Sequence, residues 1–379
     1  MLPTLRADPR VKLVAGTDPR PEAGALLARE FGARIHADVA ALCADPEVEV
    51  VYVATPHQMH AEHVRLAAAA GKHALVEKPM AINLAQCQAM VDAARAAHTQ
   101  LIIGHSHSFD LPYLKARAIV ERGRLGAVRM VNAQYYTDFL YRPRRPEELD
   151  TAQGGGVIFS QAAHQIDIVR LLCGGRAVSV RAQTGAWDPA RPTEGAYAAL
   201  ISFTDGVFAT VVYSGYGAYD GDELAGWVGE SGHPKNPDAY TSGRAKLAAL
   251  SDAAAEAQAK AARNFGGAAY VPGAAPPHHQ HFGHVVVCCE RGDIRPGPAA
   301  VVSYGAAGRI SEALPAPAVP RREVIDELWA AVREGVAPLH DGAWSLATLE
   351  VCLAILESAR TGREVPLHHQ VAPQPVRLA

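Results

Sequence analysis

The chain has 379 residues, of which 49% are hydrophobic and 20% charged, and its formal net charge is −3. This composition is typical of a globular protein of about two domains, and the charge excludes the basic surface that nucleic-acid binding requires. Met1 to Arg6 lack the apolar core of a signal peptide, and we find no long apolar run that predicts a membrane span. The six cysteines form no CxxC pair, so we expect neither a zinc site nor a disulfide framework, and we expect a cytoplasmic location.

Short apolar runs alternate with helical stretches through the first third of the chain. Residues 11–18, 48–54, 73–77 and 101–104 are predicted strands, with a predicted helix between each pair of neighbours. Strands separated by helices of this length indicate βαβ units and a parallel sheet. We therefore predict a dinucleotide-binding domain of the Rossmann type over residues 1–110.

Asp18 ends the first predicted strand, where a dinucleotide fold holds the ribose hydroxyls of adenosine. Such an acid follows a G-x-G-x-x-G turn by about 20 residues, but only 17 residues precede Asp18 and none of them forms that turn. Met1 to Ala7 instead resemble the end of the helix that follows the turn. We therefore expect that the first strand and the glycine loop, which holds the pyrophosphate, are missing, through a late start codon or a truncation. On this expectation the chain binds its cofactor poorly.

After about residue 125 the predicted strands carry β-branched and aromatic residues and indicate an antiparallel sheet in an α+β domain over residues 111–379. An insertion or lid is predicted at about 217–277, because loops of this length are unusual unless they are functional. The predicted elements here are strands at 128–136, 178–184, 196–204 and 206–214, an Ala-rich helix at 244–263, and helices at 324–332 and 346–359.

Several motifs follow one another in a fixed order along the chain. They are Ala54-Thr55-Pro56-His57 with His60, Glu77-Lys78-Pro79, Gly154-Gly155-Gly156 followed by His164 and Asp167, and Pro338-Leu339-His340-Asp341-Gly342. This ordered series resembles the Gfo/Idh/MocA oxidoreductases. The resemblance implies a Rossmann domain followed by an open, mainly antiparallel sheet, an NAD(P)-dependent dehydrogenase, and packing of those sheets into homodimers or homotetramers.

The resemblance also implies a cofactor site at the ends of the predicted parallel strands. A carboxylate at position 18 repels a 2′-phosphate and favours NAD, whereas Arg20 would tolerate NADP. The cofactor is therefore expected to be NAD or NADP, with NAD preferred. The implied cofactor-binding residues are Asp18, Arg20, Thr55, Pro56, His60, Glu77, Lys78 and Pro79.

Three residues are implied as catalytic. Lys78 would bind the reacting hydroxyl and help to move its proton, and Pro79 would often follow a cis peptide bond. His164 would be the second group that handles protons, because histidine titrates near neutral pH. Asp167 lies three residues later on the same helix face, where it would orient His164 or bind substrate. The alternatives are a solvated surface lysine, a structural histidine and a solvated aspartate.

The candidate substrate residues include departures from the family pattern. Many polyol-oxidising members have an aspartate four residues before the histidine, whereas this chain has Ser160 followed by Gln161. Arginine pairs bind carboxylates effectively, although a solvated loop is the alternative for these arginines. The remaining candidates are His105 and His107, which either line the site or are satisfied by backbone groups, and Arg142 and Arg144. No metal is expected, even at His278 to His284, since no acid or thiol lies near them.

These departures favour an acidic, aromatic-type substrate. The chain is similar to the family branch of phthalate 4,5-cis-dihydrodiol (4,5-dihydroxyphthalate) dehydrogenases, which act in phthalate degradation and oxidise a ring diol to a catechol. The alternatives are a sugar or polyol dehydrogenase of the same family, and a non-catalytic or cofactor-deficient relative that acts as a binding protein. The expected partner is a small-molecule substrate, with no nucleic acid and no membrane.

Overall fold

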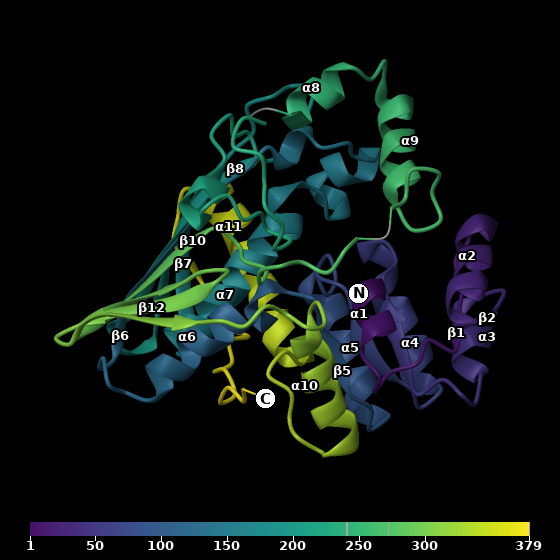
Figure 1. The fold of residues 1–379 in the computed structure, drawn as a ribbon, viewed down its shortest axis with the longest axis horizontal. Helices are drawn as coiled ribbons and strands as arrows, with labels where there is room; N and C mark the ends of the chain where they lie inside the picture. Colours follow the sequence, from purple (N-terminus) through teal and green to yellow (C-terminus); the bar gives the residue numbers. More distant parts are fainter. Residues whose placement is uncertain (240–241, 272, 379) are drawn as a thin grey trace.

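A computed structural model describes residues 1–239, 242–271 and 273–378 of the chain. Two regions differ in the architecture of their sheets (Figure 1). The first hundred residues form an α/β region with short parallel strands, and the rest of the chain builds one large sheet with helices against it. The predicted fold class is therefore confirmed.

The α/β region contains two separate parallel sheets. The larger has the strand order β3-β4-β5, and the smaller pairs β1 with β2. The strand predicted over 11–18 is shorter than expected, since only Ala15 and Gly16 pair with another strand. The elements are α1 (Leu2–Ala7), β1 (Ala15–Gly16), α2 (Pro21–Phe31), β2 (Arg34–Ile35), α3 (Val39–Ala44), β3 (Val50–Val53), α4 (His60–Ala69), β4 (His73–Val76), α5 (Leu84–Ala96) and β5 (Leu101–Ile103).

No strand in the described part of the chain joins the β1–β2 pair to the β3-β4-β5 sheet. The described residues ahead of β1 form the short helix α1, as predicted, and contain no glycine-rich turn. Leu5 of α1 packs with α10 (Arg322–Arg333) on a cluster that includes Leu75 and Ile102. The carboxyl ends of the parallel strands β3, β4 and β5 form one edge of the α/β region, and a dinucleotide site is expected at this edge.

The large sheet has nine strands in the order β13-β12-β11-β10-β6-β9-β8-β7-β14. Every neighbouring pair is antiparallel except β6 and β9, so the prediction of a mainly antiparallel sheet is confirmed. Its strands are β6 (Val128–Tyr136), β7 (Ala177–Gly185), β8 (Ala196–Phe203), β9 (Phe208–Ser214), β10 (His284–Cys289), β11 (Gly292–Pro296), β12 (Ala300–Gly305), β13 (Gly308–Ala313) and β14 (Val365–Pro366).

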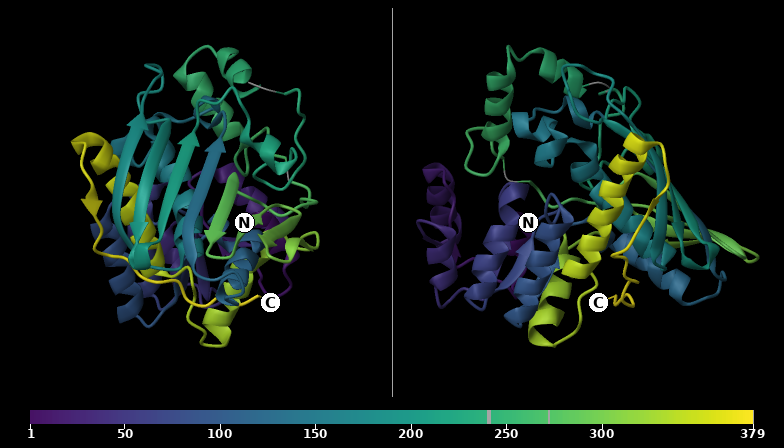
Figure 2. Two further views of the ribbon diagram at one scale, coloured as in Figure 1. Left: turned by 90° about the vertical axis from the view of Figure 1, so that its left-hand side faces the viewer. Right: turned by 180° about the vertical axis from the view of Figure 1, so that it is seen from behind.

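Helices cover one face of this sheet: α6 (Leu111–Glu121), α7 (Ala163–Cys173) and α11 (Gly342–Thr361) pack behind it, and the other face is open (Figure 2). By length and composition alone α11 would pass as a membrane span, with a mean hydropathy of 1.3. However, 67% of that window is buried inside the protein, as in the core helices of soluble proteins, so this is weak support for a span. α7 carries the second group of predicted site residues.

The predicted insertion lies above both regions and contains two helices rather than one (Figure 1). The single helix predicted over 244–263 is wrong, because Asp252 accepts a hydrogen bond from Ala255 N and starts a new helix. Gly266, after this helix, lies against α2, since an added Cβ would be 2.7 Å from Ala23 Cα. The insertion therefore contacts the α/β region as well as the region of the large sheet, to which it belongs. Its helices are α8 (Ser242–Ala248) and α9 (Ala253–Arg263).

Candidate active site

Residues at the carboxyl ends of four parallel strands meet near one edge of the α/β region. Asp18 follows β1, Thr55 and Pro56 follow β3, Glu77 follows β4 and His105 follows β5. Parallel strands bring their ends together, and ligands of open α/β sheets bind outside those ends. The role of these strand-end residues in binding a cofactor stays a prediction.

Asp18 forms a two-point ion pair with Arg20. Asp18 Oδ1 accepts hydrogen bonds from Arg20 N at 2.9 Å and from Nε at 3.0 Å, and Oδ2 accepts one from the terminal nitrogen at 2.9 Å. The side chains are 24% and 36% exposed, respectively. The acid and the base that bear on cofactor choice are therefore held together at the surface.

His60 does not lie at the surface of this edge, so its predicted contact with the cofactor is wrong. Its side chain is fully buried. Nδ1 lies 3.1 Å from the carbonyl oxygen of Pro79 and Nε2 lies 2.9 Å from that of Thr55. Burial lowers the pKa of His60, although its contacts with the carbonyl oxygens oppose this shift, and the ring lies between the segments that follow β3 and β4.

Lys78 is held between β4 and the turn that precedes α7. Its Nζ donates a hydrogen bond to the main-chain oxygen of Ser160 at 2.6 Å, and the Lys78–Pro79 peptide bond is cis, as the resemblance implied. Burial lowers the pKa of Lys78 to about 8, although the charges of Glu77 and Glu230 oppose this shift. A lysine with this pKa loses its proton at moderately alkaline pH, as a base in alcohol oxidation must.

His164 lies on the first turn of α7 and is buried. Its Nδ1 accepts a hydrogen bond from the main-chain N–H of His107 at 3.4 Å. Burial, followed by the charges of Lys78 and His107, holds the pKa of His164 well below its ordinary value. The imidazole is therefore neutral, and the contact with His107 leaves its proton on Nε2.

Asp167 does not orient His164. Its Oδ1 accepts a hydrogen bond from Thr348 Oγ1 at 2.8 Å, and Oδ2 accepts one from Ser108 Oγ. The residue is 4% exposed, so it joins α7 to α11 and to the turn after β5. The sequence placed Asp167 and His164 on one helix face, but in the structure Asp167 bonds to other side chains.

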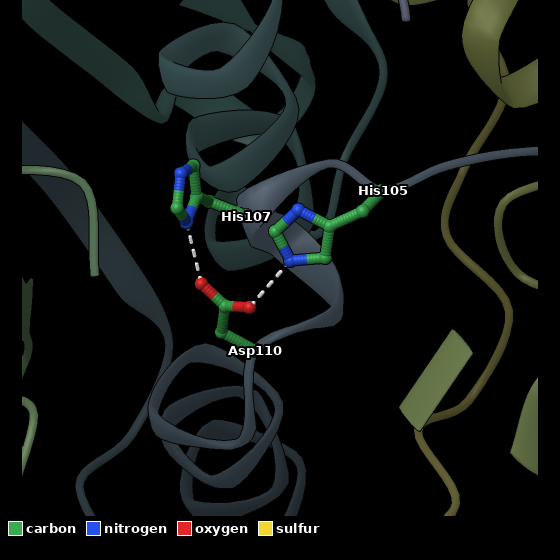
Figure 3. Close-up of side chains that lie close together, drawn as sticks. All are labelled: His105, His107 and Asp110. Atoms are coloured by element: carbon green, nitrogen blue, oxygen red, sulfur yellow. Dashed lines mark hydrogen bonds and ion pairs between the residues drawn. The ribbon is translucent and has the colours of Figure 1, made fainter. Parts of the chain in front are cut away.

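A hydrogen-bonded bridge follows β5 (Figure 3). His105 Nε2 lies 2.7 Å from Asp110 Oδ1, and His107 Nδ1 lies 2.6 Å from Asp110 Oδ2. All three side chains are at most 5% exposed. Their ligand atoms lie within 4.8 Å of one another, but each imidazole nitrogen is directed at its own oxygen of Asp110. We therefore interpret the cluster as a bridge between side chains, and backbone groups do not satisfy these histidines.

The two histidines of this bridge differ in charge. Burial, followed by the charge of Arg321, lowers the pKa of His105 to about 3. Burial also acts against the charged form of His107, but the carboxylates of Asp110 and Glu230 outweigh it and raise the pKa of His107. His107 is thus the cation of the bridge.

The two predicted arginines differ in burial and in their partners. The Arg144 guanidinium lies 3.6 Å from the centre of the Phe139 ring and donates a hydrogen bond to the oxygen of the same residue at 2.8 Å, and its side chain is 8% exposed. Arg144 Nε has no hydrogen-bond partner among the described residues, so its contact with substrate stays a prediction. The Arg142 side chain is 43% exposed and donates from Nε to Asp138 at 3.2 Å.

Ser160 and Gln161 contribute in different ways. The main-chain oxygen of Ser160 receives the Lys78 hydrogen bond, and the Gln161 side chain accepts one from the Tyr213 hydroxyl at 3.3 Å. Sequence reasoning missed Asp110, although it follows His107 by only three residues. It also missed Glu230 of the insertion, whose Oε1 lies 3.4 Å from His107 Nε2, and nothing in the sequence marks that residue.

Family models describe both halves of the chain. The model of an oxidoreductase family with an NAD-binding Rossmann fold matches residues 1–105, and the model of the GFO/IDH/MocA C-terminal domain matches residues 113–232. The chain belongs to the Gfo/Idh/MocA oxidoreductases. It is thus a member of an enzyme family of NAD(P)-dependent dehydrogenases.

Similar proteins agree with this assignment. The 1-carboxy-3-chloro-3,4-dihydroxycyclohexa-1,5-diene dehydrogenase of Comamonas testosteroni is 46% identical over 95% of this chain and 91% of its own length. Inositol 2-dehydrogenase 2 of Saccharopolyspora erythraea is 32% identical over 62% of this chain and 68% of its own. A crystal structure from Bordetella bronchiseptica RB50 is 40% identical, has a TM-score of 0.91 and covers 97% of this chain and 95% of its own.

Proposed function

We propose that this dehydrogenase oxidises a carboxylated ring cis-diol to the corresponding catechol with NAD⁺ or NADP⁺. The observation that carries the proposal is the placement of Lys78 Nζ against Ser160 O, near the neutral His164. The relative from Comamonas testosteroni, similar over 95% of the chain, is named for a substrate with one ring carboxylate and two hydroxyls. The phthalate diol, with two carboxylates, is the related substrate that the sequence suggested.

The strand-end residues fit a dinucleotide by the chemistry of their donors. Asp18 would offer carboxylate oxygens to ribose hydroxyls, Thr55 and Pro56 would border the middle of the cofactor, and Glu77 and Lys78 would lie beside the nicotinamide. When bound, the nicotinamide supplies the hydride acceptor. The described residues include no glycine turn for the pyrophosphate. We therefore propose contacts only with the two ends of the cofactor, the adenosine ribose and the nicotinamide.

The chain's own residues would move the proton. The neutral amine of Lys78 would take the proton of the reacting hydroxyl while the hydride leaves the carbon that bears this hydroxyl. His164, with its proton on Nε2, would donate a hydrogen bond to the same oxygen or its neighbour. The ring ketone that results loses a proton from the neighbouring ring carbon to the solvent, its carbonyl oxygen takes up a proton from the solvent, and the ring becomes the aromatic catechol. Overall, one hydride and one proton leave the diol.

Arg142 would bind the ring carboxylate. Burial acts against the ionised form of Glu230, but the hydrogen bond and charge of His107, followed by the charge of Arg142, lower its pKa to about 2. Arg142 is therefore on the His107 side of the site. A guanidinium with free N–H groups binds carboxylates in a two-point fashion.

The test measures reduction of NAD⁺ and NADP⁺ with four substrates: the carboxylated cis-diol of the Comamonas relative, the phthalate cis-dihydrodiol, myo-inositol and glucose. We expect turnover with the carboxylated diols. Turnover of the sugar and inositol alone would contradict the proposal and favour a polyol dehydrogenase, a function for which the similarity to inositol 2-dehydrogenase 2 speaks.

A cofactor-deficient binding protein is the alternative that the sequence suggested. Titration of NADH against tryptophan fluorescence separates the two. Quenching that saturates supports the dehydrogenase, and its absence supports the binding protein.

We also propose a cytoplasmic homodimer or homotetramer that packs through the open face of the large sheet. Leu200 and Phe208 project from this face of β8 and β9 and are 45% and 40% exposed. An L200E variant is expected to lower the molar mass measured by light scattering, and a monomeric wild-type chain would contradict the proposal.

A further inference from the structure

Glu230 lies in the insertion, far along the chain from the catalytic motifs, and its side chain reaches His107. Its Oε1 lies 3.4 Å from His107 Nε2, and its main-chain oxygen accepts a hydrogen bond from His281 N at 3.4 Å. The His281 ring lies 2.8 Å from the main-chain oxygen of Val228. The segment that carries Glu230 is therefore tied to the residues just before β10, and the carboxylate is held by these contacts.

His107 is bonded to a carboxylate on both sides. Nδ1 lies 2.6 Å from Asp110 and Nε2 lies 3.4 Å from Glu230. An ionised carboxylate only accepts hydrogen bonds, so both ring nitrogens must carry a proton. The arrangement therefore requires an imidazolium, with Asp110 and Glu230 as its two acceptors.

The imidazolium is in direct contact with the catalytic histidine. The ring centres of His107 and His164 are 4.6 Å apart, and the main-chain N–H of His107 donates to His164 Nδ1 at 3.4 Å. This contact decides which nitrogen of His164 carries the proton. An imidazole held in one tautomer by a neighbour is a common device in proton transfer.

We propose that Glu230 is a positioning residue that the insertion contributes to the active site. It fixes His107 between two carboxylates, and His107 in turn fixes the orientation and tautomer of His164. The part that concerns catalysis rests on the proposed function, whereas the hydrogen-bond chain from Glu230 to His164 does not.

Charged and titratable groups face His107 from three parts of the fold. Asp110 and His105 belong to its own turn, His164 faces it from α7, and Glu230 faces it from the insertion. The ring of Phe282 closes the remaining apolar side, with its centre 5.1 Å from that of His107. Removal of Glu230 therefore leaves Asp110 as the single carboxylate on this ring.

The first test reads the charge of His107 without any substrate. ¹⁵N spectra of the histidine rings are recorded against pH for the full chain, for E230Q, which keeps an acceptor but removes the charge, and for E230A. The signals of His107 are identified by their loss in H107Q. D238N is the control, because Asp238 is an exposed acid of the same insertion.

We expect both nitrogens of His107 to be protonated at neutral pH in the wild type and in D238N. In E230Q and E230A, His107 should lose its charge at a lower pH. Identical titrations in wild type and E230Q would overturn the proposal. Stoichiometric Zn²⁺ binding that removes the wild-type His105 and His107 signals would also overturn it, since the cluster would then be a metal site.

The second test separates positioning from a merely structural role. With the carboxylated diol, E230Q should lower kcat by about 10-fold or more, since small displacements of catalytic groups are costly, and should leave KM within about 3-fold of its wild-type value. A changed His107 titration with unchanged kcat would overturn the positioning role. Lack of turnover by the wild type would instead contradict the proposed function, and the histidine spectra would still decide the hydrogen-bond chain.

Discussion

Lys78 donates a hydrogen bond from Nζ to the main-chain oxygen of Ser160 at 2.6 Å, and this contact joins positions 82 residues apart. It connects the end of β4, where a nicotinamide would lie, with the turn of residues 158–162 that leads into α7. The lysine from the α/β region is thereby held beside the helix that carries His164. One hydrogen bond thus brings the two proposed proton-handling residues into one site.

A K78M variant should therefore lose turnover and keep its affinity for the cofactor. Loss of a general base typically lowers kcat by about 10²–10⁴-fold, whereas Kd for NADH, measured by fluorescence, should change by less than about 3-fold. K72M is the control, because Lys72 lies just before the start of β4, at the opposite end of this strand from Lys78, and donates a hydrogen bond to the main-chain oxygen of Asp45. An equal loss of turnover and of cofactor affinity would argue against a role in proton transfer.

The pH dependence of diol oxidation should follow the amine of Lys78. Burial lowers its pKa to about 8, and the base is active only when neutral. The rate constant kcat/KM should therefore rise with pH, reach half of its maximum near this pKa and then level off. A profile that falls over the same range would indicate that the protonated lysine is the active form.

Arg142 provides a prediction about substrate selectivity. R142Q should raise KM for the carboxylated diol by about 10-fold or more, since hydrogen bonds to charged groups contribute about 1.5–3 kcal/mol, and should leave KM for a neutral ring diol nearly unchanged. R145Q is the control, because Arg145 is already paired with Glu147 at 3.1 Å. Similar effects of R142Q on both substrates would show that Arg142 does not bind the carboxylate.

Cofactor preference should depend on Asp18. The carboxylate, although paired with Arg20, disfavours a 2′-phosphate. In D18S the arginine would be released to bind that phosphate. The ratio of the Kd values for NADPH and NADH should therefore fall by about 10-fold or more, a change of about 1.4 kcal/mol. A ratio that stays the same would place the adenosine ribose elsewhere.

The sequence was sufficient for the elements that depend on local pattern. Apolar runs predicted the main parallel strands and four strands of the large sheet, β6 to β9, but not β10 to β14. Motif order predicted the family, because the motifs are encoded in consecutive residues. The helix break at Asp252 was missed because a capping residue inside an Ala-rich stretch is a weak signal.

The site was only partly predictable, because side-chain partners depend on tertiary contacts. His60 has the residue type expected of a ligand-binding group, but its side chain is buried and both ring nitrogens lie against main-chain carbonyl oxygens. Glu230 could not be found, since its role depends on how the insertion folds back onto the turn after β5.

Asp167 is the residue for which a structural role and a catalytic role can be distinguished most clearly. Its oxygens accept hydrogen bonds from the hydroxyls of Thr348 and Ser108, and Ser108 Oγ in turn lies 2.8 Å from His340 Nε2. This chain joins α7, α11 and the turn after β5 in the buried interior. D167A would leave both hydroxyls without this acceptor, and each buried unpaired group costs about 1–3 kcal/mol.

We therefore expect urea denaturation of D167A to give a free energy of unfolding lower by a few kcal/mol. D167N keeps one acceptor and the shape of the side chain, so it should fold and retain most of the wild-type kcat. If D167N instead folds with unchanged stability and loses kcat by about 100-fold or more, as removal of a catalytic acid or base would, Asp167 acts in the reaction and the structural assignment is wrong.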